Sequence, residues 1–164
     1  MEARLKFRET QIGKQFYKNM LANEAVLHHG PAPVATMELM KIRASQINGC
    51  GHCVDMHVKD AAYAGETSER LALVAAWREA PYFTEPERAA LALTEEACRL
   101  ADEPGGVSDE VWAEVQKHYD DEQAAALVAA LAQINAWNRI NVTLRNPAGG
   151  YDPAEKAKRY KSTP

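Results

Sequence analysis

The abundance of strong helix-forming residues constrains the fold of this chain more than any other feature. Ala occurs 29 times, Glu 16 times and Leu 12 times among the 164 residues, and all three have high helix propensity. Val, Ile and Thr total only 22 residues and form no convincing alternating run of the kind that marks a strand. We therefore expect an all-α fold. The length favours a single domain over residues 1–164, because domains commonly contain roughly 100–200 residues.

Capping signals and the helical spacing of apolar residues predict about six to seven helices. Helix ends are expected where Gly30-Pro31, Asn48-Gly49 and Gly65 interrupt the apolar pattern. The run from Thr84 to Glu87 has the form of a capping box with an early proline, which begins a helix. The expected helices cover about 12–28, 34–46, 50–64, 67–77, 84–101, a segment from 108 through 115, and 120–144.

The last expected helix is apolar on more than one stripe. Its apolar residues include Leu127 and Leu131, and their distribution predicts burial on several sides. Asn135, Asn138 and Asn141 interrupt this surface, and buried amides need hydrogen-bond partners. We expect those partners in neighbouring loops or at a subunit interface. So much apolar helix surface in a small chain indicates a homo-oligomer.

Charge and hydropathy exclude several classes of protein. The net charge of −4 argues against a nucleic-acid binder, because phosphate contacts need a basic surface. The longest apolar run covers the nine residues 124–132, whereas a membrane-spanning helix needs roughly 20. The charged first residues lack the apolar core of a signal peptide. We therefore expect a cytoplasmic protein with no nucleic-acid partner and no membrane partner.

Residues that carry chemistry gather between positions 48 and 57. Cys50 and Cys53 are three residues apart at an expected helix start, so their thiols lie on one face within reach of a disulfide. Unpaired N–H groups and the helix dipole favour a thiolate there. His57 follows Cys53 by four residues on the same face and could act as its base. His52 lies between the two cysteines, and we expect its side chain to point away from the face that they share with His57. In a reducing cytosol this arrangement favours redox or metal chemistry.

Three other kinds of site also place cysteines at this spacing. Covalent haem attachment needs a histidine directly after the second cysteine, where this chain has Val54. A thioredoxin fold needs a strand before the cysteines, and residues 37–47 do not have a strand pattern. A tetrahedral zinc site stays open. Its ligands would be Cys50, Cys53 and His57, completed by His28, His29 or Glu38. Cys98 has nothing reactive near it in sequence, and we expect a core residue there.

From Glu38 to His57 the chain follows the pattern E-x11-C-x2-C-x3-H. This segment resembles the core signature of AhpD-like alkylhydroperoxidases, within the carboxymuconolactone decarboxylase superfamily. The later segment from Ile134 to Asn141, followed by Pro147-Ala-Gly-Gly, also resembles small single-domain members. Decarboxylases of the superfamily generally lack the cysteine pair, so the resemblance favours a peroxidase.

The resemblance implies a proton relay of four residues and one auxiliary histidine. By position in the motif the relay is Glu38, Cys50, Cys53 and His57, with His52 at the family's intermediate histidine. A carboxylate beside an imidazole orients the ring. With His57 as the base, we expect Cys53 to attack a peroxide and Cys50 to resolve the sulfenic acid, which gives a redox-active disulfide. Position at the helix start would instead favour Cys50 as the attacking thiol.

The resemblance also implies partners and a biological role. The expected function is thiol-dependent reduction of peroxides in antioxidant defence, with no cofactor and no resident metal. The expected partners are a peroxide, an external dithiol on a lipoyl-bearing or thioredoxin-like protein, and a peroxiredoxin in some members. The family assembles as trimers or hexamers, and we expect a homo-oligomer of that kind. Two alternatives stay open: a disulfide reductase or electron adaptor for a peroxiredoxin, and a zinc-binding regulatory module that uses the same thiols.

Overall fold

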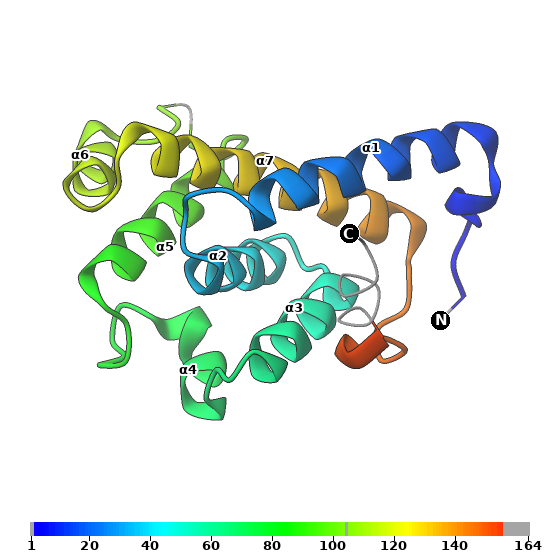
Figure 1. Ribbon diagram of the computed structural model, residues 1–164, viewed down its shortest axis with the longest axis horizontal. Coiled ribbons are helices and arrows are strands. Elements are labelled where there is room, and N and C mark those ends of the chain that lie inside the picture. Colours follow the sequence, from blue (N-terminus) through cyan, green and yellow to red (C-terminus); the bar gives the residue numbers. More distant parts are fainter. Residues whose placement is uncertain (1, 104, 156–164) are drawn as a thin grey trace.

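The computed structural model describes residues 2–103 and 105–155, and the regular structure in these ranges is entirely helical. This confirms the predicted all-α class. The helices that lie wholly within these ranges are seven α-helices and two short 3-10 helices (Figure 1), and residues 153–155 are also helical. In order they are η1 (Phe7–Glu9), α1 (Gln11–His28), α2 (Val34–Ile47), α3 (Gly51–Tyr63), α4 (Ser68–Leu73), η2 (Val74–Ala76), α5 (Glu85–Ala97), α6 (Asp109–His118) and α7 (Asp121–Leu144).

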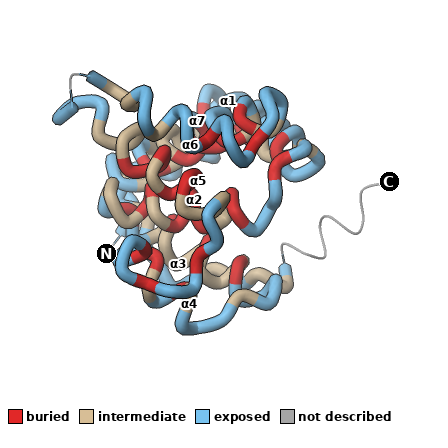
Figure 2. The backbone as a smooth tube through the Cα atoms, turned by 90° about the vertical axis from the view of Figure 1, so that its left-hand side faces the viewer, coloured by how far each residue is buried: buried red, intermediate tan, exposed pale blue. Residues whose placement is uncertain are grey.

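Helix α2 lies at the centre of the fold. It packs against α3, α5 and α7, and Figure 1 shows α1 and α7 side by side along one edge, with α3 and α4 toward the opposite edge. Its side chains Met37, Leu39, Met40 and Ile42 are each at most 1% exposed. Because these buried apolar residues lie on more than one side of α2, the helix needs neighbouring elements around it. Figure 2 shows the same pattern, with buried residues between the helices and exposed residues outside.

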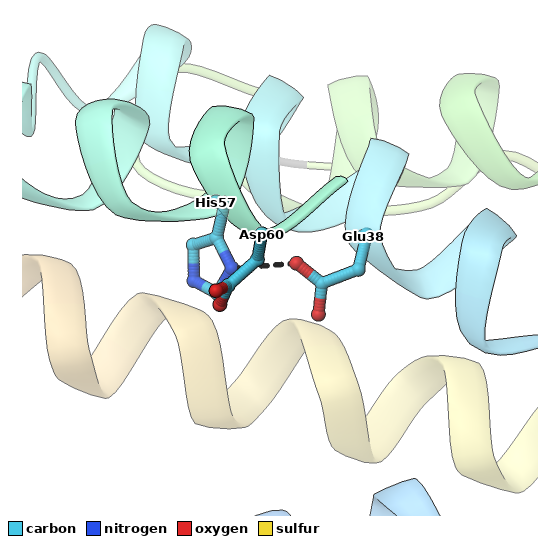
Figure 3. Close-up of side chains that lie close together, drawn as sticks. All are labelled: Glu38, His57 and Asp60. Atoms are coloured by element: carbon cyan, nitrogen blue, oxygen red, sulfur yellow. Dashed lines mark hydrogen bonds and ion pairs between the residues drawn. The ribbon is translucent and has the colours of Figure 1, made fainter. Parts of the chain in front are cut away.

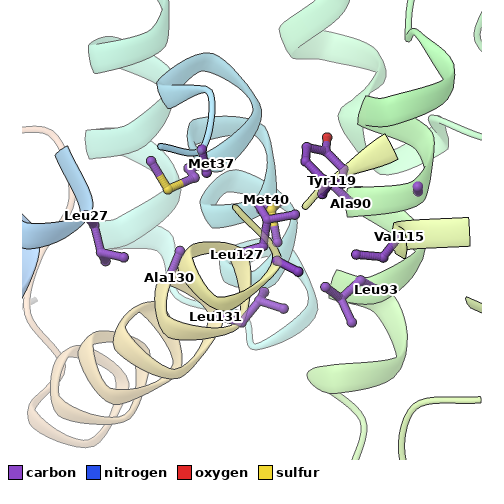
Figure 4. Close-up of a cluster of buried hydrophobic side chains, with 13 residues drawn as sticks. Leu27, Met37, Met40, Ala90, Leu93, Val115, Tyr119, Leu127, Ala130 and Leu131 are labelled. Atoms are coloured by element: carbon purple, nitrogen blue, oxygen red, sulfur yellow. The ribbon is translucent and has the colours of Figure 1, made fainter. Parts of the chain in front are cut away.

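Two hydrophobic clusters meet at α2. One joins α2, α5, α6 and α7 (Figure 4) and contains Met40, Leu93, Val115 and Leu127. The other joins α2 to α3, α4 and the chain after η2, and includes Ile42. Because α2 contributes to both clusters, its position is fixed from two sides.

Helix α7 is buried on its inner faces only. It packs against α1, α2, α3, α5 and α6, and Leu127 and Ile134 are at most 1% exposed. Val128, however, is 46% exposed, and Ala125 and Ala129 are exposed beside it. The prediction that α7 is buried on several sides is therefore confirmed for its inner faces. It is wrong for this outer stripe, which no other element of the described chain covers. No helix in the described ranges, α7 included, is long and apolar enough to cross a bilayer.

Two predicted helix boundaries were wrong. The capping box at Thr84 forms as predicted, but α5 ends at Ala97, four residues before the expected end. There the Arg99 N–H bonds to the Glu96 carbonyl at 3.0 Å, and the Glu96 carboxylate accepts the Ser108 N–H at 2.7 Å. These contacts turn the chain back toward α6. The helix expected over 67–77 is also divided into α4 and the short η2.

Glu95 joins three parts of the chain in a buried charge cluster. Glu95 is 7% exposed. The carboxylate accepts hydrogen bonds from Arg43 Nε at 2.6 Å, Arg99 Nη2 at 3.0 Å and Trp77 Nε1 at 3.3 Å. Burial alone raises the pKa of this carboxyl, but the hydrogen bonds from Arg43 and Arg99 outweigh burial and lower the pKa to about 2. The ionised carboxylate therefore holds α2 against α5.

Replacing Glu95 by glutamine should make the protein less sensitive to acid. The folded-state pKa lies below the ordinary value of 4.5, so the native state binds fewer protons than the unfolded state. The stabilisation is complete above pH 4.5 and is lost as the pH falls toward about 2. Across this pH interval, we expect the free energy of unfolding of the wild type to fall by about 1–3 kcal/mol more than that of Glu95→Gln, as measured by urea unfolding. The exposed Glu79 provides a control, and Glu79→Gln should follow the wild type. Parallel curves for the wild type and Glu95→Gln would contradict the prediction.

Candidate functional site at the start of α3

The turn between α2 and α3 is held by the long helix α7. Gly49 has a left-handed backbone with φ +65°, which glycine adopts without strain, and so the predicted helix end at Asn48-Gly49 is confirmed. The Asn48 side-chain amide donates to Asn138 Oδ1 at 2.8 Å and to Asn135 Oδ1 at 3.0 Å. Asn138 in turn donates to Ser45 Oγ at 3.1 Å. Two of the three asparagines of α7 therefore position the residues that precede Cys50.

Cys50 and Cys53 form a disulfide at the start of α3. Their Cα atoms are 5.3 Å apart, which is ordinary disulfide geometry. Cys50 is the N-cap residue, and its Sγ accepts the Cys53 backbone N–H at 3.3 Å. The third asparagine of α7, Asn141, donates to Cys53 Sγ at 3.4 Å. The two cysteines are 1% and 0% exposed, so the pair faces inward against α7.

His57 and Glu38 are joined by a hydrogen bond between α3 and α2. His57 Nδ1 lies 2.8 Å from Glu38 Oε2. A carboxylate only accepts, so this contact assigns the proton to Nδ1 and leaves the lone pair on Nε2. Nε2 is buried and has no hydrogen-bond partner among the described residues. The imidazole is therefore oriented by Glu38 and retains one nitrogen that can accept a proton.

The ammonium of Lys41 compensates the negative charge of two buried carboxylates, Glu38 and Glu24. It lies 3.2 Å from Glu38 Oε1 and 3.2 Å from Glu24 Oε2. Burial lowers the pKa of Lys41, but the two carboxylates outweigh burial and raise it overall. Trp137 Nε1 donates to Glu24 Oε1 at 2.9 Å. A continuous polar chain thus runs from α7 through α1 and α2 to His57 on α3.

Asp60 brings a second carboxylate close to His57 (Figure 3). One ligand atom each from Glu38, His57 and Asp60 lie within 4.8 Å of one another. Oxygen and nitrogen atoms at this spacing could hold a divalent cation. We interpret them as the hydrogen-bonded Glu38–His57 pair with Asp60 beside it, because Glu38 already contacts His57 and the Lys41 ammonium, whose positive charge opposes cation binding. Asp60 Oδ1 also accepts the hydroxyl of Tyr151 at 2.5 Å.

The remaining candidates lie outside this cluster. His52 Nδ1 contacts the Pro147 carbonyl at 2.8 Å, so the ring points toward the C-terminal segment, as expected for a side chain that points elsewhere. Cys98 is half-buried and packs against the hydrophobic cluster that contains the disulfide. Burial raises the pKa of its thiol, which makes it less reactive. His28 and His29 are exposed at the end of α1. Both candidate thiol ligands of the zinc alternative are in the disulfide, so a zinc site would require the reduced protein.

The sequence analysis did not identify three residues of this site: Lys41, Glu24 and Asp60. For two of them, the spacing in the sequence was informative. Lys41 follows Glu38 by three residues on α2, and Asp60 follows His57 by three residues on the same face of α3. Glu24 left no local signal, because it reaches the site from α1.

Comparison with known proteins identifies the family. Residues 15–96 match the carboxymuconolactone decarboxylase family, and this range includes the motif from Glu38 to His57. The chain belongs to this family. The protein YdfG of Bacillus subtilis, which is uncharacterized, is 39% identical over 138 residues, covering 84% of this chain and 92% of YdfG.

Solved structures share the fold of this chain. One is a protein of unknown function from Agrobacterium tumefaciens, provisionally described as the antioxidant defence protein AhpD. It is 31% identical with a TM-score of 0.84, covering 92% of this chain and 100% of its own. The debrominase Bmp8 is 17% identical with a TM-score of 0.72, covering 84% of this chain and 73% of its own, and shows the common fold alone. The predicted resemblance to AhpD-like members of the superfamily is confirmed.

Replacing Lys41 by methionine should destabilise this family member strongly. The Lys41 side chain is 8% exposed, and its loss removes the ammonium that contacts the buried carboxylates of Glu24 and Glu38. We expect a loss of about 3–5 kcal/mol in the free energy of unfolding at neutral pH. The same substitution at Lys59, whose side chain is 34% exposed in its pair with Asp55, should cost less than about 1 kcal/mol. Equal losses in urea unfolding of the two variants would contradict this account of Lys41.

Proposed function

We propose that the protein is a thiol-dependent peroxidase of the alkylhydroperoxidase type that acts in antioxidant defence. The observation that carries the proposal is the pairing of a Cys50–Cys53 disulfide with His57, whose Nδ1 is held by Glu38 and whose Nε2 has no hydrogen-bond partner within residues 2–103 and 105–155. Two thiols that can exchange electrons and a base with a free lone pair are the groups that peroxide reduction needs. The AhpD-like relatives support the same reaction class.

The oxidative half-reaction begins from the reduced protein. Nε2 of His57 takes the Cys53 proton, directly or through a water, and leaves a thiolate. The thiolate attacks the peroxide ROOH. An S–O bond forms, the O–O bond breaks, and the alkoxide leaves as an alcohol with the proton held by His57. Cys53 is now a sulfenic acid. Cys50 attacks this sulfur, and the disulfide forms as the hydroxyl leaves with the Cys50 proton as water.

The reductive half-reaction needs two electrons from an external dithiol. A thiolate of a lipoyl-bearing or thioredoxin-like protein attacks one sulfur of the Cys50–Cys53 disulfide, and its second thiol completes the exchange. A peroxiredoxin is the alternative partner, with this protein passing it electrons. Because the cysteines are 1% and 0% exposed, one sulfur must become accessible before the exchange. We expect this local opening to limit the rate of reduction.

The same proposal includes location and assembly. The cytoplasm is reducing and returns such a disulfide to its dithiol form. A homo-oligomer, trimer or hexamer, would cover the exposed stripe of α7 at Ala125, Val128 and Ala129.

Dimedone labelling tests which cysteine attacks the peroxide. In a Cys98→Ser background, the reduced Cys50→Ser variant treated with peroxide should carry a dimedone adduct on Cys53, because no resolving thiol remains. The matched Cys53→Ser variant should carry little adduct on Cys50. Mass spectrometry locates the adduct. Label on Cys50 alone would reverse the two roles, and no label with any peroxide would reject the peroxidase. Stoichiometric zinc in the reduced preparation would support the zinc-binding alternative.

The pH dependence of thiol alkylation tests the role of His57. In the reduced protein, His57→Gln removes the base, and the alkylation rate with iodoacetamide at neutral pH should fall about tenfold. His118→Gln is the control, because that histidine is exposed in the last turn of α6, and its rate should stay at the wild-type value. Identical profiles for His57→Gln and the wild type would mean that no proton relay activates the thiol.

A further inference from the structure

The carboxylate of Asp60 is the one charged group of the His57 cluster that the proposed function leaves without a role. It lies one turn after His57 on α3 and within 4.8 Å of ligand atoms of both His57 and Glu38 (Figure 3). Placing two carboxylates this close in a half-buried site costs free energy unless positive charge is available nearby. Lys41 supplies positive charge to Glu38. The imidazole of His57, which lies close to both carboxylates, supplies positive charge when it is protonated.

The C-terminal segment fixes Asp60 in this position. Residues 147–151 follow one face of α3 through contacts at successive turns. These contacts join Pro147 to His52 at 2.8 Å, Gly149 to Asp55 at 3.0 Å, Tyr151 O to Lys59 at 3.2 Å and Tyr151 Oη to Asp60 at 2.5 Å. The Tyr151 hydroxyl donates to one oxygen of Asp60 and so orients the carboxylate. Since Asp60 and Tyr151 are both half-buried, they connect the His57 cluster to the surface that the segment forms.

We propose that Asp60 is a positioning residue for His57, holding positive charge on the imidazole and linking the buried ring to solvent through Tyr151. This inference rests on the proposed function and extends it by one residue. Glu38 sets the direction of the ring through Nδ1. Asp60 stabilises the imidazolium that forms when Nε2 takes a proton from the thiol.

The chemistry of the reductive half-reaction explains why such a link is needed. An external dithiol that attacks as a thiolate leaves its protons in solvent, and it leaves behind two thiolates where the Cys50–Cys53 disulfide was. One or two protons must therefore return from solvent to the site in each cycle. His57 is only 4% exposed, so exchange through the ring alone would require it to move. A half-buried carboxylate beside the ring can pass these protons without that movement.

Several charged or titratable groups determine the charge of the imidazole, and the experiment has to separate Asp60 from them. Among the residues that the structure describes, they include Glu38 and Lys41 on α2, Glu24 on α1 beside Lys41, Cys53 and Asp60 on α3, and Tyr151 in the C-terminal segment. Asn is the informative substitution at Asp60. Its amide oxygen can still accept the Tyr151 hydroxyl, so the segment keeps its anchor while the charge is lost.

The test measures iodoacetamide alkylation of the reduced protein against pH, in the Cys50→Ser, Cys98→Ser background so that only Cys53 reacts. Asp60→Asn should move the midpoint of this profile up by about one pH unit, because loss of a negative charge within 4.8 Å disfavours the imidazolium and its paired thiolate. Asp60→Glu should restore most of the shift. The matched control is Asp55→Asn, which alters a carboxylate that also binds the segment but lies outside the cluster.

A second measurement separates proton transfer from docking of the segment. Reduction of the disulfide by dithiothreitol at neutral pH should slow several-fold in Asp60→Asn and stay unchanged in Asp55→Asn. Tyr151→Phe removes the hydroxyl but keeps the Asp60 charge, so its alkylation midpoint should shift less than that of Asp60→Asn. If Tyr151→Phe shifts the midpoint as far, or if Asp60→Asn leaves it in place, the inference is wrong.

These outcomes also separate the inference from the proposed function. Alkylation and reduction by dithiothreitol need no peroxide, so they report on the relay even if no peroxide is a substrate. A shift in His57→Gln without a shift in Asp60→Asn would overturn only the role of Asp60. No shift in either variant would overturn the His57 relay itself. Urea unfolding of each variant shows whether it remains folded under the conditions of the assays.

Discussion

The hydrogen bond between Glu38 and His57 is possible only because the surrounding helices compensate a buried carboxylate. A charged carboxylate at the centre of a helical core is costly unless it is paired and hydrogen-bonded. Lys41 supplies the positive charge from the next turn of α2, and Glu24 with Trp137 completes the chain of partners. The orientation of the imidazole on α3 therefore depends on residues of α1, α2 and α7. A change in how these helices pack would alter the candidate site.

Helix α7 contributes to the core and to the site at once, which explains its unusual composition. Its inner face carries Leu127 and Ile134 into the hydrophobic clusters. Its asparagines lie on the part that faces the turn before Cys50, where Asn138 binds Asn48 and Asn141 contacts Cys53. Each buried amide has a partner, as buried polar groups require. Because the disulfide packs directly against this helix, the two sulfurs are inaccessible in the oxidised chain.

Local patterns were enough to predict the helices and the group of thiols and histidine. The capping box at Thr84, the left-handed helix end at Gly49 and the disulfide between Cys50 and Cys53 all depend on residues a few positions apart. The end of α5 was predicted four residues late, because it depends on a contact between Glu96 and Ser108 across a loop. The exposed stripe at Val128 was also missed, since apolar composition does not show which sides of a helix other elements cover.

The sequence alone determined the all-α class, the helix starts and the spacing that places Cys50, Cys53 and His57 on one face of α3. It did so because capping and i, i+3 and i, i+4 neighbours are properties of a single helix. Only the tertiary structure decided that Lys41 is buried between two carboxylates and that Tyr151 lies against Asp60. These contacts join segments up to 91 residues apart. The Glu24–Lys41 and Tyr151–Asp60 contacts arise from the packing of segments distant in sequence, so no local pattern specifies them.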